Sequence, residues 1–250
     1  MTDLLIGHGE VGSALHEVLG ERRELIVIDR AKGFDPPESF EPDWLHIAIP
    51  YTDSFMDTVI AYVSAFYPNK VVIHSTVPIG TTRLVHRKML ELDVYYSPVR
   101  GRHPRLARYI REFPKWYASA ALGNMDRRFS EYFALAGVQT RKAPSFEFLE
   151  WAKLWETTSY GYNLIMWQEI ERQVKDIPGD IQRNLSALKI WFHEKKKVYD
   201  GDLGYVPIYD LVPGPIGGHC ILPNVELLKE RLTPELYAWL KASNASRTEQ

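Results

Sequence analysis

Apolar and polar residues alternate in blocks along the first third of the chain, and these blocks predict strands separated by helices. Four short apolar runs are typical of buried strands, because polar residues, glycine or proline bound each of them. They cover residues 4–6, 25–28, 44–49 and 71–73. Apolar positions recur at helical spacing over residues 11–19 and 53–66. This alternation predicts a parallel sheet covered by helices on both faces.

The pattern continues less regularly and then changes character. Further strands are expected at residues 94–96, 116–122 and 138–140, and a further helix at 125–135. Between Pro144 and Pro178 there is no proline and only one glycine, Gly161, while aromatic and aliphatic residues recur at helical spacings. This segment predicts one long helix. Additional helices are expected at 180–198 and 225–241.

These elements predict an α/β protein with two domains. Residues 1–143 would form the parallel-sheet domain, and residues 144–243 an all-helical domain built on the long central helix. Residues 244–250 would be a frayed tail. The long helix is broadly apolar and rich in Trp and Tyr, so its surface must be buried against other elements. We expect a homodimer that forms through this helix.

The loop after the first strand has the pattern of a phosphate-binding turn. Gly7-His8-Gly9-Glu10-Val11-Gly12 joins a predicted strand to a predicted helix, and Asp29 ends the next strand. In a Rossmann-type domain these glycines permit the turn, the approach of a pyrophosphate and close helix packing, while the acid binds the adenosine ribose. Asp29 favours NAD over NADP, although Arg30 could pair with a 2′-phosphate. The candidate cofactor-binding residues of this part of the chain are Gly7, His8, Gly9, Glu10, Val11, Gly12, Asp29, Arg30 and Pro50.

Composition narrows the class of protein further. The formal net charge of −2 provides no excess positive field, which argues against nucleic acid as a partner. A single cysteine, Cys220, excludes an internal disulfide and fits a reducing compartment. No apolar run approaches the roughly twenty residues that span a bilayer. We therefore expect a cytoplasmic protein that associates with no membrane, and we expect no metal site.

Three further segments, read with the glycine loop, carry a resemblance to a known family. They are Ser75-Thr76-Val77-Pro78-Ile79-Gly80-Thr81-Thr82, Glu150-x-x-Lys153, and Gly214-Pro215-Ile216-Gly217-Gly218-His219-Cys220-Ile221. In this order they resemble the UDP-glucose, UDP-N-acetylmannosamine and GDP-mannose dehydrogenases. The resemblance implies oxidation of a sugar alcohol to a carboxylate by two NAD molecules, through a thiohemiacetal and a thioester. It implies that Cys220 is the nucleophile, that Lys153 stabilises the oxyanion, and that Thr76 lies at the mouth of the cofactor site.

The sequence also departs from the pattern of this family. Thr157 stands where the family has an asparagine that holds the oxyanion or a water, and Asn224 stands where it has an aspartate base. Val99 and His103 replace two acids beside the substrate. The chain also ends where the family's nucleotide-gripping domain would begin, so a partner would supply that domain or the substrate would not be a full nucleotide sugar. The candidate catalytic residues are Cys220, Lys153, Thr76, Thr157 and Asn224.

Three functions from different classes fit these residues. The first is an NAD-dependent dehydrogenase that oxidises a hydroxyl of a sugar-like, possibly nucleotide-linked, or other small polar substrate through a cysteine-bound intermediate. The second resembles the beta-hydroxyacid dehydrogenases, in which a helix lysine alone moves the proton and Cys220 is dispensable. The third is a non-catalytic NAD-binding regulatory or scaffold subunit, which the replacements at Val99, Thr157 and Asn224 favour.

Overall fold

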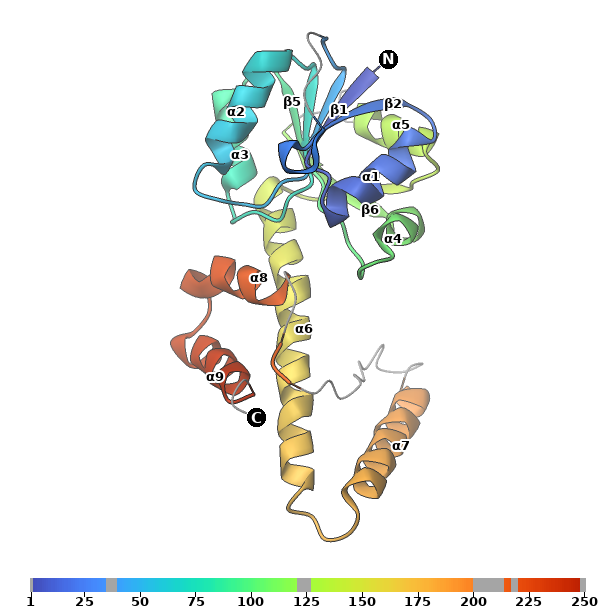
Figure 1. Cartoon of the computed structure of the whole chain (residues 1–250), viewed down its shortest axis with the longest axis vertical. Helices are drawn as coiled ribbons and strands as arrows, with labels where there is room; N and C mark the ends of the chain where they lie inside the picture. The colour runs from blue at the N-terminus through green and yellow to red at the C-terminus, as the bar shows by residue number, and fades with distance from the viewer. Residues whose placement is uncertain (1, 35–39, 121–126, 200–213, 217–219, 248–250) are drawn as a thin grey trace. The chain divides into compact units, whose positions relative to one another are not determined.

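The computed structural model describes residues 2–34, 40–120, 127–199, 214–216 and 220–247 (Figure 1). The chain divides into two compact units, Met1–Lys153 and Leu154–Gln250. In the part of the chain that is described, no helix is both long enough and apolar enough to cross a membrane.

The first unit is built on a seven-stranded sheet with the order β2-β1-β3-β4-β5-β6-β7. Every neighbouring pair of strands is parallel except β5 and β6, which are antiparallel. The predicted α/β fold is therefore confirmed, with one reversed strand that the apolar pattern did not indicate. The strands are β1 (Thr2–Ile6), β2 (Glu24–Ile28), β3 (Trp44–Ile47), β4 (Lys70–Ile73), β5 (Asp93–Tyr96), β6 (Lys115–Ser119) and β7 (Thr140–Lys142).

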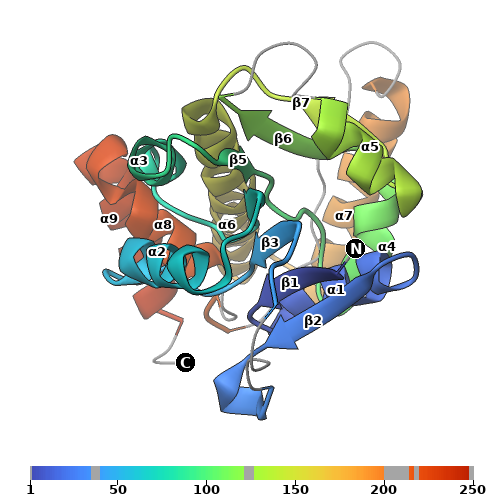
Figure 2. The same cartoon turned by 90° about the horizontal axis from the view of Figure 1, so that it is seen from above.

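Helices cover both faces of this sheet, as Figure 2 shows. One face packs against α1 (Glu10–Gly20), α4 (Leu106–Glu112) and α5 (Arg127–Leu135), and the other against α2 (Phe55–Phe66) and α3 (Thr81–Lys88). The start of α6 (Phe146–Val174) completes the second core with Phe146 and Leu149. The strands are apolar on both faces for this reason, as expected for a doubly covered parallel sheet.

The strand order reverses direction at β1. The chain leaves β1 through α1 to reach β2 on one side, and it later returns to β3 on the other side. In open α/β sheets, ligands bind outside the carboxyl ends of the strands at such a switch point. This topology points to the loops after β1 and β3, where the predicted phosphate loop and Pro50 lie.

Several elements begin or end where the apolar pattern did not place them. The third strand ends at Ile47 rather than residue 49, and the sixth and seventh strands are Lys115–Ser119 and Thr140–Lys142. Helices α3 and α4 were not predicted, because each is short and buries only three positions. The short 3-10 helix η1 (Arg30–Lys32) follows β2.

The described residues of the second unit form only helices and turns. After α6 come α7 (Ile181–Tyr199), α8 (Ile221–Leu228), the 3-10 helix η3 (Lys229–Arg231) and α9 (Pro234–Ala245). The prediction of one helix over 225–241 is wrong, because Leu232 and Thr233 are extended and Pro234 begins a new helix. Proline lacks an amide hydrogen and is favoured at that first helical position.

Helix α9 extends two residues past the predicted domain end at residue 243. Residues 244–247 were expected to be frayed, but α9 continues to Ala245. The Asn244 side chain accepts a hydrogen bond from the Ile216 amide at 2.6 Å, and Arg247 donates to the Gln168 carbonyl oxygen. These bonds within the second unit hold the end of the helix.

Candidate dinucleotide and catalytic site

The segment from β1 into α1 contains three glycines, and the physical reason for the absence of a side chain differs among them. Gly7 has a φ of +92°, and a Cβ there would lie 2.5 Å from the Ala48 carbonyl oxygen. At Gly12 a Cβ would lie 1.9 Å from the carbonyl oxygen of Gly7. At Gly9 a Cβ would meet none of the described residues within 4 Å. The fold itself therefore requires Gly7 and Gly12, whereas Gly9 leaves open space where an outside group can approach the backbone.

The N-terminus of α1 faces this open space. Gly9 is the N-cap residue and provides no side-chain cap, so no cap acceptor covers the amides that follow at Glu10 and Val11. Unpaired amides at a helix N-terminus, together with the helix dipole, favour a bound phosphate. The Glu10 carboxylate in this first turn points to His103, whose Nε2 lies 2.9 Å away. The residues of the loop fit the pyrophosphate of a dinucleotide.

Asp29 lies beside the same loop at the carboxyl end of β2. Its Oδ2 accepts a hydrogen bond from the His8 amide at 2.8 Å, and the Lys32 Nζ donates to the His8 carbonyl oxygen at 2.6 Å. The half-buried Asp29 side chain is thus held next to the phosphate loop, in the position where a ribose would be bound. The side chain of Arg30, the other residue expected to influence the choice of cofactor, lies outside the described part.

Pro50 and Thr76 follow β3 and β4 at the same edge of the sheet. Thr76 is half-buried and Pro50 is exposed. Helix α3 begins a few residues after Thr76 and receives its cap from another element: the buried Glu150 of α6 accepts hydrogen bonds from the amides of Gly80 at 2.6 Å and Thr82 at 2.8 Å. Burial raises the pKa of Glu150, although these hydrogen bonds oppose the shift. This contact connects the loop after β4 to the start of α6, three residues before Lys153.

A group of buried basic side chains lies below the same edge. His46 and His74 are fully enclosed, with 3.0 Å between His46 Nδ1 and His74 Nε2, and His74 Nδ1 lies 2.7 Å from the Ser97 carbonyl oxygen. Lys115 donates to the same oxygen at 3.0 Å. Burial, followed by the charge of Lys115, lowers the pKa of His46 to about 3, and the same causes hold the pKa of His74 well below 6.5. Burial and the charge of Lys153 lower the pKa of Lys115 to about 7.

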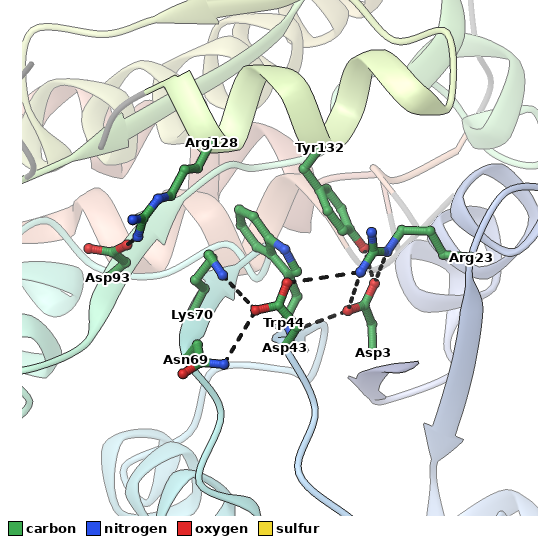
Figure 3. A network of polar contacts seen from close by, with 9 residues as sticks. All are labelled: Asp3, Arg23, Asp43, Trp44, Asn69, Lys70, Asp93, Arg128 and Tyr132. Carbon is green, nitrogen blue, oxygen red and sulfur yellow. Dashed lines mark hydrogen bonds and ion pairs between the residues drawn. The ribbon is translucent and has the colours of Figure 1, made fainter. Parts of the chain in front are cut away.

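Through Tyr132, the histidine pair is connected to a network of polar contacts at the opposite edge of the sheet, which Figure 3 shows. His46 Nε2 lies 2.8 Å from the Tyr132 hydroxyl, which donates to Asp3 at 2.8 Å. The buried Asp3 carboxylate also accepts two bonds from Arg23 and one from the Trp44 amide. Burial, and next the charge of Asp3, raise the pKa of Tyr132. The buried charge of the Asp3 carboxylate is therefore stabilised by four donated hydrogen bonds, as in structural ion pairs.

The predicted nucleophile lies in the second unit. Cys220 is an exposed free thiol and the N-cap residue of α8. The next residue, Ile221, packs on α6 at Gly161, where a Cβ would lie 2.5 Å from an Ile221 methyl group. Thr157 lies one helical turn before Gly161 on the same face of α6. The only glycine in α6 therefore positions the start of α8, and with it the cysteine, against the helix that carries Thr157.

The residues that replace the family's acids occupy different environments. Asn224 is buried in the first turn of α8, and its backbone amide donates a hydrogen bond to the Cys220 carbonyl oxygen at 3.2 Å. Val99 is buried in the core on the α1 side of the sheet. His103 lies beside Glu10, where it borders a hollow of about 200 Å³ with α1 and α4. Residues 217–219 of the cysteine loop lie outside the described part.

Sequence reasoning missed Lys115, His46 and His74. The only signal was a lysine at the start of an apolar run and a histidine within or at the end of two others. Charged or titratable residues in strands that are otherwise apolar indicate a buried polar cluster. In the described ranges, no group of three or more His, Cys, Asp or Glu residues could hold a metal ion.

Comparison with known proteins gives structural but not sequence relatives. No family model matches the sequence, and no curated protein matches it either. Among solved structures, a UDP-D-ManNAc dehydrogenase from Pyrococcus horikoshii superposes with a TM-score of 0.69 at 16% identity. The alignment covers 99% of this chain and 69% of that one. These values show that the two proteins share a fold.

Two further structures show the range of that fold. A UDP-glucose dehydrogenase from Pyrobaculum islandicum matches with a TM-score of 0.67 at 17% identity, over 98% of this chain and 68% of that one. A 3-hydroxyisobutyrate dehydrogenase from Mycobacterium tuberculosis matches with a TM-score of 0.68 at 15% identity, over 98% and 92%. The chain thus has the fold of both groups and is close in length to the second.

Proposed function

We propose that this protein is an NAD-dependent dehydrogenase that oxidises a hydroxyl of a sugar-like or other small polar substrate. The observation that carries the proposal is the space at Gly9. The fold itself requires Gly7 and Gly12, but no contact with the described residues requires Gly9 to lack a side chain. A cofactor pyrophosphate on the amides of α1 accounts for it. The structural neighbours, which are named as dehydrogenases, support the same proposal.

The residues at the carboxyl ends of the strands fit a dinucleotide that is bound in one orientation. The pyrophosphate would lie on the amides after Gly9, and Asp29 would accept hydrogen bonds from the adenosine ribose hydroxyls. Asp29 would also repel a 2′-phosphate, which favours NAD over NADP. Pro50 and Thr76 would then border the nicotinamide half, because they follow the next strands along the same edge. When bound, the nicotinamide supplies the acceptor for a hydride.

Lys153 and Cys220 are the residues that we propose for the reacting centre. A lysine on the helix after the nucleotide-binding sheet can hold or move the proton of the substrate oxygen. Cys220 is an exposed free thiol at the N-terminus of α8. A thiolate there would trap an aldehyde product for a second oxidation. Thr157 and Asn224 would support that step by hydrogen bonding, since neither side chain can accept a proton as a base near neutral pH.

The 3-hydroxyisobutyrate dehydrogenase match favours a second candidate, a two-electron oxidation without the cysteine. That structure corresponds to this chain over nearly its whole length, whereas about a third of each nucleotide-sugar dehydrogenase lies outside the alignment. In this alternative Lys153 alone moves the proton. We further propose that the protein is cytoplasmic and forms a homodimer through α6, which exposes Trp151 and Met166.

Formation of NADH by the purified protein tests the function. The protein is incubated with NAD and a panel of nucleotide sugars, simple sugars and 3-hydroxy acids, and NADH is followed by absorbance. We expect turnover with at least one substrate, lost in Lys153→Met and kept in the matched surface control Lys88→Met. Two NADH per product, reduced to one or none in Cys220→Ser, would support the covalent route, and an unchanged Cys220→Ser the second candidate. Tight NAD binding without turnover on any substrate would instead favour a non-catalytic subunit.

A further inference from the structure

Helix α7 has apolar side chains on two opposite faces. On one face Leu185 is buried, and the ring of Phe192 meets the ring of Trp167 on α6 edge-on, with 5.0 Å between the ring centroids. This face therefore packs within the second unit. On the other face, Ile190 is 60% exposed and Trp191 is 72% exposed. A helix that is apolar on opposite faces is typically buried on both, so we expect a second partner for α7.

The exposed face of α7 has an apolar centre between two opposite charges. Arg183, Ala187, Ile190 and Glu194 are spaced four, three and four residues apart, so they form one line along the helix, which we call the α7 stripe. All four residues are exposed. Within the described part of the chain, neither Arg183 nor Glu194 forms an ion pair through its side chain. The two charges lie about 16 Å apart along the helix, which is too far for them to pair with each other.

The α7 stripe is complementary to itself when its direction is reversed. The spacing of four, three and four residues is the same from either end, so two antiparallel copies bring the four positions into register. Arg183 then lies opposite Glu194 of the partner subunit, and Ala187 lies opposite Ile190 of the partner subunit. Opposite charges meet at both ends, and a small side chain faces a large one at the centre. A contact with two-fold symmetry requires a surface of this kind.

We propose that α7 is a contact between two copies of this chain, which pair in antiparallel orientation along the α7 stripe. A parallel pair would instead place Arg183 against Arg183 and Glu194 against Glu194, so the charges select the antiparallel arrangement. Two helices of this length bury less than the roughly 1,200 Å² of a standard interface, so the expected dissociation constant is in the micromolar range. This contact is separate from the homodimer proposed through α6, and it does not depend on the dehydrogenase activity.

Charge reversal at the two ends of the α7 stripe tests the pairing. Arg183→Glu and Glu194→Arg each replace two attractive pairs with two repulsive ones, whereas the double variant restores both pairs with the charges exchanged. We expect each single variant to raise the dissociation constant for self-association at least about tenfold, and the double variant to return it to within about threefold of wild type. The constant is measured by analytical ultracentrifugation over a concentration series. The matched control is Lys175→Glu, the same change of charge at an exposed residue before α7, which should leave the constant unchanged.

Disulfide trapping tests the direction of the two helices. Arg183→Cys and Glu194→Cys are made in a Cys220→Ser background and oxidised with copper–phenanthroline, first separately and then as a mixture. In the antiparallel pair, position 183 of one copy lies beside position 194 of the other, while identical positions lie about 16 Å apart along the helices, beyond the reach of a disulfide. We therefore expect a linked dimer in the mixture alone.

The outcomes separate this contact from the α6 homodimer and from the enzymatic function. Cross-linking of each protein alone, without the mixture, would indicate a parallel pair and would overturn the proposal. A double variant as weak as the single variants, or a wild type that is monomeric at about 100 µM, would also overturn it. Self-association that is unchanged in every α7 variant would assign the contact to another surface, and it would overturn this inference while leaving α6 and the dehydrogenase activity untouched.

Discussion

Two lysines at opposite ends of one sheet have opposite environments. Lys70 begins β4 at the amino edge, and its Nζ lies 2.6 Å from an Asp43 carboxylate oxygen (Figure 3). Lys115 lies under the carboxyl edge with carbonyl oxygens as its hydrogen-bond partners. The first lysine is paired with a carboxylate, whereas burial and a like charge lower the pKa of the second.

The difference separates structural charges from reactive ones. At the amino edge, Asp3 is paired with Arg23, and Asp43 with Lys70, so these charges hold neighbouring segments of the sheet together. At the carboxyl edge, the loops leave open space at Gly9 and an amine that titrates near neutrality. Perturbed pKa values combined with an open ligand-binding edge are typical of functional sites.

The largest effect on stability is expected from removing the buried charge of Asp3 at the amino edge of the sheet. Asp3→Asn keeps the shape of the side chain but leaves Arg23 without its buried counter-charge. We expect the free energy of unfolding to fall by about 3 to 5 kcal/mol, measured by urea denaturation at pH 7. The matched control is Asp57→Asn on the exposed first turn of α2, which should change stability by less than about 1 kcal/mol. A similar loss of unfolding free energy in both variants would contradict a structural role of the buried Asp3 charge.

A smaller change in stability, of opposite sign, is expected when Lys115 at the carboxyl edge is replaced. Folding lowers the pKa of Lys115 from 10.5 to about 7, so the unfolded state binds more protons between these values. Stability contributed by this group therefore rises with pH above 7, by about 3 kcal/mol up to pH 10. Lys115→Met should be more stable than wild type at pH 7, and its advantage should shrink towards pH 10. An advantage independent of pH would show that Lys115 is not a depressed titrating group.

The smallest effect is expected for the partly exposed pair at the amino edge. Burial opposes ionisation of Asp43, but the hydrogen bond and charge of Lys70, with smaller contributions from Asn69 and Arg23, together lower the Asp43 pKa below 3.8. The stabilisation is thus present above that pH and is lost as the pH falls through the lowered value. Lys70→Met should cost about 1 kcal/mol at pH 7 and nothing at pH 2. Equal costs at both pH values would contradict an electrostatic origin.

Much of the architecture could be predicted because it depends on local patterns. The apolar runs predicted β1, β2 and β4 closely, and the absence of proline predicted α6. The glycine loop indicated the phosphate-binding edge, since Gly7 and Gly12 follow from backbone sterics that any such turn shares. The break between α8 and α9 was visible as Thr233-Pro234, a cap followed by a first-turn proline, but helical spacing on both sides obscured it.

The rest could not be predicted because it depends on contacts between residues far apart in the sequence. Lys115 reads as an ordinary strand-end lysine until β5 brings the Ser97 carbonyl oxygen to its Nζ. Glu150 reads as part of a motif, yet its contacts are with the amides of α3, some seventy residues earlier. The reversed direction of β6 likewise follows from how α4 returns the chain, which apolar periodicity does not encode.

Binding of NAD to wild type, Gly9→Ala and Gly20→Ala, measured by isothermal titration calorimetry, tests the central claim most directly. Gly9 has a φ of −71° and open space around a Cβ, so alanine there should fold normally. At Gly20, far from the loop on the same helix, a Cβ would meet only the His16 ring, at 3.4 Å. The account predicts that wild type and Gly20→Ala bind NAD alike, while Gly9→Ala binds at least about tenfold more weakly, or about 1.4 kcal/mol, at unchanged stability. Equal affinity of all three proteins, or no binding by wild type, would contradict it.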